Sequence, residues 1–113
     1  MVSIITIAET ADIKLPEIQI KNALSASATV KVQIAGEPEI SLKFNDVYKW
    51  NVTRNEKLNS TASFGPFTAN WYAFDPSSDA GHAINYQSIT SYGIYQSFDN
   101  SNYRLIAEWD LTN

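Results

Sequence analysis

One histidine and a short acidic loop are the residues of this sequence best suited to acid–base chemistry. His82 follows a loop that contains Asp75 and Asp79, and many hydrolases combine a histidine with nearby carboxylates. Nucleophilic catalysis also needs a positioned nucleophile, and the chain contains no Gly-x-Ser-x-Gly motif or comparable signature. A hydrolase that uses Asp75 or Asp79 with His82 is therefore the least favoured hypothesis, and we expect the protein not to be an enzyme.

Oxygen atoms suited to binding a metal ion occur in two loops. Asp75 and Asp79 share the first loop, and Asp99, Asn100 and Asn102 share the second, but neither loop has the spacing of an EF-hand. Asp and Asn are also common in turns, because their side chains bind the nearby backbone. With no cysteine and one histidine, thiol catalysis, iron–sulfur clusters and multi-histidine zinc sites are excluded. We expect no metal site and no cofactor.

The charge balance bears on the class of partner. The 113 residues include 8 Lys or Arg and 12 Asp or Glu, a formal net charge of −4 that argues against nucleic acid and anionic membranes as partners. No stretch approaches the roughly 20 apolar residues needed to cross a bilayer. Residues 1–15 lack a basic leading region and contain Glu9 and Asp12, so we expect no cleaved signal peptide. The expected location is extracellular by a non-classical route, or cytoplasmic, and the sequons at Asn51 and Asn59 are then chance matches.

The elements that must position these residues are strands, since polar and apolar residues alternate along most of the chain. In residues 29–34 the apolar side chains of Val30, Val32 and Ile34 alternate with polar ones, which is typical of a sheet with one wet face. Turn residues recur every eight to twelve positions, most clearly at 36–38, 65–66, 75–81 and 99–102. This pattern predicts an all-β domain over residues 16–113, an antiparallel β-sandwich of seven or eight strands.

The N-terminal segment, residues 1–15, does not fit that alternation. Ile4, Ile7, Ala8 and Ala11 share one face of a helix, whereas the β-branched run around Ile5 favours a strand. The residues themselves leave helix and strand open, and Pro16 ends whichever element forms. Such an apolar stripe has no obvious place in a sandwich, and contact with a second copy of the chain would remove it from water.

Aromatic residues are the most suggestive candidates for binding. The chain has three Trp, six Tyr and five Phe, and alternation along the strands would leave part of this set exposed. Exposed Trp and Tyr rings stack on the apolar faces of sugars or anchor protein partners, although core packing accounts for many such rings. The candidates are Trp50, Trp71, Tyr72, Tyr92, Tyr95, Tyr103 and Trp109.

Three stretches resemble the fungal immunomodulatory proteins. Residues 103–109 resemble that family's near-terminal aromatic-Ile-Ile-Ala-Gln/Glu-Trp strand, and residues 46–52 resemble its Asp-Lys-x-Tyr-x-Tyr-Arg-Val strand. Residues 81–84 are similar to its Gly-Tyr-Gly-Ile segment, and the length and absence of cysteine also fit. The family's Asp-Tyr-Thr-Pro-x-Trp-x-Arg-Gly segment has no counterpart, because residues 22–27 read Asn-Ala-Leu-Ser-Ala-Ser.

The resemblance implies a fold, an assembly and a function. The fold would be an immunoglobulin-like or fibronectin III-like sandwich preceded by a short N-terminal helix, with the dimer interface formed by residues Ile4, Ile5, Ile7, Ala8 and Ala11. Trp109 and Thr90 match positions linked to glycan contact in that family. The expected function is a non-enzymatic dimeric immunomodulatory protein that binds receptors or glycans on eukaryotic cell surfaces. The alternative is a small lectin or carbohydrate-binding module with a role in defence.

Overall fold

The backbone of this protein is built mostly from strands, and the computed structural model describes residues 14–25 and 27–111. These residues form ten strands and one short helix, α2 (Pro76–Asp79). The strands are β1 (Glu17–Asn22), β2 (Val30–Ile34), β3 (Ile40–Leu42), β4 (Val47–Asn51), β5 (Leu58–Phe64), β6 (Phe67–Phe74), β7 (Ile84–Thr90), β8 (Gly93–Ser97), β9 (Arg104–Ala107) and β10 (Asp110–Leu111). The predicted all-β fold is confirmed.

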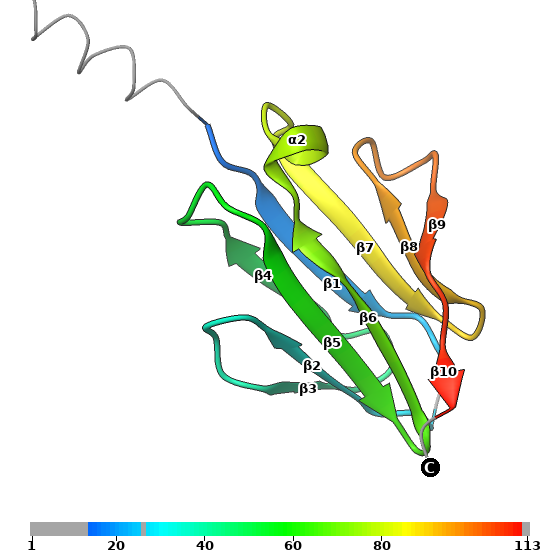
Figure 1. The fold of residues 1–113 in the computed structure, drawn as a ribbon. Coiled ribbons are helices and arrows are strands. Elements are labelled where there is room, and N and C mark those ends of the chain that lie inside the picture. The colour runs from blue at the N-terminus through cyan, green and yellow to red at the C-terminus, as the bar shows by residue number, and fades with distance from the viewer. Residues whose placement is uncertain (1–13, 26, 112–113) are drawn as a thin grey trace, which may run out of the picture.

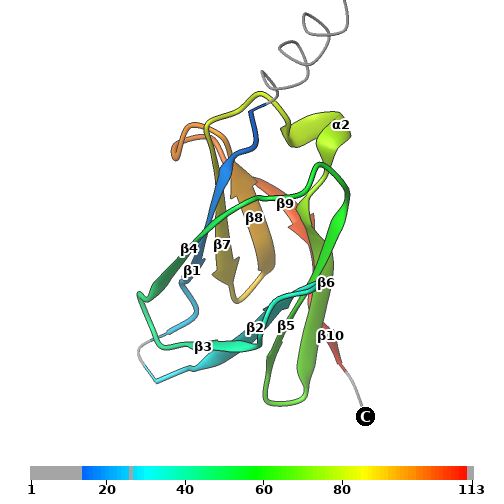
Figure 2. The ribbon, with the colours of Figure 1, turned by 90° about the vertical axis from the view of Figure 1, so that its left-hand side faces the viewer.

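The strands form two sheets of five strands each that pack face to face. One sheet has the order β4-β1-β7-β8-β9 and the other has the order β10-β6-β5-β2-β3. Figures 1 and 2 show the two sheets from views a quarter turn apart, with α2 at one end of the sandwich and β10 at the other. The predicted sandwich is therefore confirmed.

The core lies between the sheets, and the alternation of the sequence explains its composition. On β2 the side chains of Val30, Val32 and Ile34 are buried, whereas Lys31 and Gln33 are exposed. The same alternation on the other long strands aims one side chain in two at the core. The buried hydrophobic residues are Ile18, Ile20, Val30, Val32, Ile34, Leu42, Val52, Leu58, Ala62, Ala69, Trp71, Ala73, Phe74, Ile89 and Ile94.

One ladder departs from the antiparallel arrangement that the sequence predicts. β1 pairs in parallel with β7, with Glu17 opposite Ile84 and Asn22 opposite Ile89, while its other neighbour, β4, is antiparallel. The chain after β1 crosses into the opposite sheet, so β1 takes both of its partners from later in the sequence. The first described strand therefore lies inside its sheet and not at an edge.

The buried side chain of Asn22 links the end of β1 by hydrogen bonds to the segments that follow it. Its side-chain amide donates hydrogen bonds to the carbonyls of Ala28 and Leu42, at 3.0 and 2.8 Å. Its side-chain oxygen accepts a hydrogen bond from the backbone N–H of Leu24. Because every polar atom of this side chain has a partner, its burial carries little penalty. Asn22 thus fixes where the chain leaves the first sheet.

The turns lie where turn residues predicted them, but the end of the chain differs. β2 and β3 are joined around Gly36, β5 and β6 meet at residues 65–66, and β8 and β9 are joined through residues 98–103. Residues 84–94, which the sequence left as one strand or two, form the β7–β8 hairpin. The single last strand predicted over residues 103–109 is wrong. The chain changes sheets after Ala107, so β9 and β10 pair with different partners.

The N-terminal predictions fall on residues that the structure does not describe. The expected helix and the dimer-interface residues lie within residues 1–13, outside the described part of the chain. The description begins at exposed Lys14, and Ile18 and Ile20 of β1 are fully buried in the core. The dimer therefore stays a prediction.

Candidate functional site

Three tyrosines line the outer surface of the β4-β1-β7-β8-β9 sheet. Along β7 the side chains of Asn85, Gln87 and Ile89 point into the sandwich, so Tyr86 and Ser88 point outward. Tyr95 on β8 lies opposite Ser88 in the ladder, and Tyr103 comes directly before β9. We call this surface, defined by Tyr86, Ser88, Thr90, Tyr95 and Tyr103, the tyrosine face.

The tyrosine face contains two adjoining hollows. The first has a volume of about 290 Å³ and is lined by Ser88, Thr90, Tyr95 and Tyr103. The second has a volume of about 230 Å³ and shares Ser88 and Tyr103 with the first. Its remaining lining residues are Gln19, Lys21, Val47, Tyr86, Gln87 and Asn100. The two hollows thus meet at a serine and a tyrosine ring, and polar side chains surround the rings.

Hydrogen bonding and burial hold Tyr103 in place between the hollows. Its hydroxyl donates a short hydrogen bond to the side-chain oxygen of Asn100, in the turn before β9. Partial burial raises the pKa of Tyr103, and the nearby Tyr86 and Asp99 raise it further. The hydroxyl is therefore neutral at physiological pH. A fixed ring with an apolar face and a neutral hydroxyl can stack on a sugar and bind its hydroxyl groups.

The structure brings together Thr90 and Trp109, the two predicted glycan-contact residues. The indole N–H of Trp109 donates a hydrogen bond of 2.7 Å to the backbone carbonyl of Thr90. The Trp109 ring is partly buried and packs edge-on against Phe64, with 4.9 Å between the ring centroids. Thr90 lines the first hollow, whereas Trp109 lines neither. Trp109 therefore supports the backbone of the tyrosine face, and a direct sugar contact for either residue stays a prediction.

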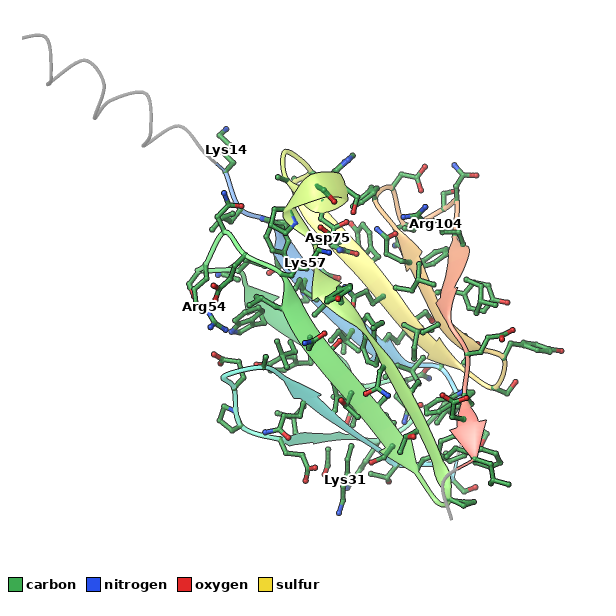
Figure 3. All side chains as sticks on the ribbon, in the orientation of Figure 1. Lys14, Lys31, Arg54, Lys57, Asp75 and Arg104 are labelled. Atoms are coloured by element: carbon green, nitrogen blue, oxygen red, sulfur yellow. The ribbon has the colours of Figure 1, made fainter. Side chains whose placement is uncertain are left out.

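A separate polar pocket lies beside α2, at one end of the sandwich. It has a volume of about 310 Å³, comparable to the smaller ligand sites of proteins. Asp75 and Arg104 both line this pocket, and Figure 3 shows them at the end of the molecule opposite Lys31. The complete lining is Asn70, Trp71, Tyr72, Asp75, Ser78, Asp79, Asn85, Gln96, Arg104 and Ile106.

Helix α2 fixes the two carboxylates of this polar pocket. Asp75 caps the helix by accepting hydrogen bonds from the N–H and hydroxyl of Ser77, and Pro76 provides a favourable first residue. Asp79 reaches back to accept a hydrogen bond of 2.8 Å from the backbone N–H of Asp75. The bonds to Ser77 lower the pKa of Asp75, whereas burial raises the pKa of Asp79. The pKa values of these two carboxyl groups, four residues apart in the sequence, are therefore shifted in opposite directions.

His82 does not join these carboxylates. Its ring stacks on Phe98, with 3.7 Å between the ring centroids and 8° between the planes, and it does not line the polar pocket. The carboxylates are also occupied in holding α2 together, as expected of Asp and Ser in a turn. The structure therefore does not place His82 beside Asp75 or Asp79 as the hydrolase hypothesis requires.

Neither a metal-binding cluster nor a membrane-spanning helix is present in the described part of the chain. Among residues 14–25 and 27–111, no group of three His, Asp or Glu side chains is placed to hold a metal ion. In the turn before β9, Asp99 accepts a hydrogen bond from the side chain of Asn102, and Asn100 accepts one from the hydroxyl of Tyr103. In these same residues, no helix has the length and apolar character needed to cross a membrane.

Comparisons with known proteins bear on the fold. No protein-family model matches the chain, and no curated protein matches its sequence. A solved structure is similar, with a TM-score of 0.71 and 18% sequence identity, over 88% of this chain and 97% of that chain. It is described as an SPH (Self-Incompatibility Protein Homologue) structure, from "a widespread family of small, highly stable, secreted proteins from plants". At this identity the similarity supports a shared β-fold and leaves the resemblance to fungal immunomodulatory proteins a prediction.

Sequence reasoning missed the most deeply buried polar residues of the polar pocket. Asn85 and Gln96 lie on the inward side of β7 and β8, with only 1% and 4% of their surface exposed. Their inward position could have been deduced from alternation, because Gln96 lies two residues after buried Ile94 and Asn85 lies four residues before buried Ile89. Whether β7 and β8 lie beside α2 depends on how the two sheets pack, and alternation does not define that packing.

Proposed function

We propose that this protein is a non-enzymatic recognition protein that binds glycans or receptors on eukaryotic cell surfaces, and that the tyrosine face is its glycan site. The observation that carries the proposal is the pair of adjoining hollows that share Ser88 and Tyr103. Two adjoining hollows offer room for more than one sugar ring, with tyrosine rings beside polar groups. A flat, uniformly apolar surface would not offer this combination.

The polar groups around the rings support a glycan over an apolar partner. Gln19 and Lys21 of β1 and Asn100 of the β8–β9 turn line the second hollow. Amide and ammonium groups donate hydrogen bonds to sugar hydroxyls, while the tyrosine rings cover the C–H faces of the sugar. Thr90 adds a hydroxyl side chain to the lining of the first hollow. Its place there agrees with the glycan contact implied by the family resemblance.

A glycan array with matched tyrosine variants tests this proposal. We expect the wild-type protein to bind a subset of glycans, and Tyr95→Ala with Tyr103→Ala to reduce that binding by about tenfold or more, because both hollows lose a ring. Tyr72→Ala is the control, since Tyr72 is an exposed tyrosine, at 46%, on the opposite sheet. Absence of glycan binding at high protein concentration, or equal losses in both variants, would refute the tyrosine face as a glycan site.

The homodimer is the second part of the proposal, and its support comes from the sequence. Residues 1–13 carry the apolar stripe of Ile4, Ile5 and Ile7, and removing them leaves the strands from Glu17 onward intact. A dimer would present each weak glycan site twice and raise the apparent affinity through avidity. We expect the full chain to elute as a dimer in size-exclusion chromatography and the variant lacking residues 1–13 to elute as a monomer. A monomeric full chain would disprove the dimer.

The immunomodulatory role is distinguished from a plain lectin by a cellular response. Stimulation of lymphocytes by the wild type, but not by the variant lacking residues 1–13, would support a dimeric immunomodulatory protein. Glycan binding without any lymphocyte response would favour the alternative, a small lectin with a role in defence. Both functions require an extracellular location, which is the description given to the similar plant protein. Asn51 and Asn59 are exposed, so glycosylation of either residue in the native protein would reveal passage through the secretory pathway.

A further inference from the structure

Two buried amide side chains in the polar pocket each have one atom without a partner. Among the described residues, the side-chain oxygen of Asn85 and the side-chain nitrogen of Gln96 are buried and accept or donate no hydrogen bond. Both side chains line the polar pocket, and both are more than nine-tenths buried. A buried polar group without a partner costs free energy, so native structures rarely keep one without a reason. These atoms are therefore an unfilled acceptor and an unfilled donor that belong to two side chains lining the same pocket.

The orientations of the two amides follow from their charged neighbours. The amide nitrogen of Asn85 donates a hydrogen bond of 3.3 Å to the carboxylate of Asp79, which leaves the Asn85 oxygen free. The oxygen of Gln96 accepts a hydrogen bond of 3.3 Å from the guanidinium of Arg104, which leaves the Gln96 nitrogen free. A carboxylate requires a donor and a guanidinium requires an acceptor, so neither amide can be reversed.

These contacts divide the polar pocket into two chemically opposite sides. The α2 side has the carboxylates of Asp75 and Asp79 and the free oxygen of Asn85, all of them acceptors. The β8–β9 side has the guanidinium of Arg104 and the free N–H of Gln96, all of them donors. Across residues 14–25 and 27–111, Arg104 forms no ion pair within 4 Å of either carboxylate. The opposite charges thus face the same space without contacting each other.

We propose that the polar pocket binds a free α-amino acid in its zwitterionic form. The ligand carboxylate binds Arg104 and the free N–H of Gln96, and the ligand ammonium binds Asp79 and the free oxygen of Asn85. Charge-assisted hydrogen bonds of this kind are about twice as strong as neutral ones. The ligand side chain lies against Ile106 and the ring of Tyr72, which complete the wall of the polar pocket. This site is separate from the tyrosine face and does not depend on the proposed glycan binding.

Other small ligands match the polar pocket less well. A neutral sugar would satisfy the free atoms of Asn85 and Gln96 but would leave the guanidinium of Arg104 without a countercharge. A simple anion would satisfy Arg104 and would be repelled by Asp75 and Asp79. A zwitterion places each charge beside its opposite, so both sides of the polar pocket gain a partner from one molecule.

Nuclear magnetic resonance titration of the full chain tests this proposal. The probes are L-alanine, L-leucine, L-phenylalanine, L-lysine and L-glutamate, each added up to about 10 mM, a range that detects millimolar affinity. We expect at least one probe to shift the backbone signals of Asn85, Gln96 and Arg104 in a saturable manner. N-acetylation or amidation of that probe removes one of its two charges and should weaken binding by about tenfold.

Two arginine variants separate binding in the polar pocket from a general charge effect. Arg104→Gln removes the guanidinium from an exposed strand position and should weaken binding by about tenfold, since one charge-assisted contact is lost. Arg54→Gln is the control, because Arg54 is an exposed arginine that pairs with Glu56 and does not line the polar pocket. Absence of shifts with all five probes, equal binding of the blocked probes, or saturable binding of glucose at the same signals would overturn the proposal.

Discussion

Asp99 shows how one carboxylate holds a turn through several hydrogen bonds. It accepts hydrogen bonds from the backbone N–H groups of Ser101 and Asn102 and from the side chains of Ser97 and Asn102. The backbone bond from Asn102 and the other bonds stabilise the charged form and lower the pKa of Asp99 far below its usual range. This turn leads into Tyr103, so Asp99 also fixes one edge of the tyrosine face.

The lowered pKa of Asp99 predicts a pH dependence of stability. Because the folded pKa lies below the unfolded one, the stabilisation is complete above about pH 4 and is lost progressively as the pH falls below that value. We expect Asp99→Asn to show a smaller decrease in the free energy of unfolding between about pH 5 and pH 2 than the wild type. Urea titrations across this range provide the measurement, and parallel curves for the two proteins would contradict the prediction.

Gln87 on β7 joins the two sheets across the core through hydrogen bonds to β6. Its side-chain oxygen accepts a hydrogen bond of 2.8 Å from the indole N–H of Trp71 on β6. Its amide nitrogen donates a hydrogen bond, also of 2.8 Å, to the backbone carbonyl of Ala73. With only 2% of its surface exposed, Gln87 is a polar residue whose burial depends on both bonds.

Replacement of Gln87 by a residue of similar size tests the contribution of this bridge. We expect Gln87→Leu to lower the free energy of unfolding by about 2–4 kcal/mol, because the Trp71 N–H and the Ala73 carbonyl lose their partners in the core. Gln33→Leu is the control, since Gln33 is exposed and its one side-chain bond lies at the surface. Chemical denaturation followed by Trp fluorescence gives both values, and equal losses would argue against the bridge.

At the scale of elements, strand pairing depends in one place on the absence of a side chain. Gly93 begins β8 with a φ of +138°, and a Cβ atom built there would lie 2.1 Å from the backbone carbonyl oxygen of Ala107. The neighbouring strand can therefore approach β8 only because residue 93 is glycine. This close approach sets the position of β9, which supplies Arg104 and Ile106 to the polar pocket.

The Gly93 contact predicts a large effect of a single methyl group. We expect Gly93→Ala to destabilise the fold by more than about 3 kcal/mol, because the clash with Ala107 involves backbone and adds to conformational strain. Gly65→Ala serves as the comparison. Gly65 also has a positive φ, +54°, but its Cβ would meet no atom within 4 Å, so we expect a loss of about 1–2 kcal/mol from strain alone. Thermal unfolding distinguishes the two cases, and similar melting temperatures would show that the Ala107 contact is unimportant.

Individual elements could be predicted from the sequence to the extent that they depend on local patterns. Alternation identified strands such as β2, and glycine with proline located the β5–β6 turn at residues 65–66. The split after Ala107 was missed, because Glu108 and Trp109 continue the same alternation while the chain changes sheets. The end of β9 depends on how the two sheets pack, which alternation does not define.

At the scale of the whole molecule, the candidate sites depend on pairings between distant segments. The polar pocket combines Asp79, Asn85, Gln96 and Arg104 from α2, β7, β8 and β9. The spacing of these four residues resembles no ligand-binding motif, and of them the sequence alone indicated only Asp79. The tyrosine face was partly foreseen, since Tyr95 and Tyr103 were candidates, but Ser88 and Gln19 join it through the order of the strands.

The interior position of β1 has a consequence for how the chain reaches this structure. Protein synthesis delivers β1 first among the described strands, yet its parallel partner β7 ends only at Thr90. Until that segment leaves the ribosome, β1 has one edge of backbone groups without strand partners, and the sheet order cannot form. Pairing between such distant segments slows folding because a long loop must close first. Acquisition of the native sheet should therefore be a late event, occurring only after the segment that ends at Thr90 has emerged.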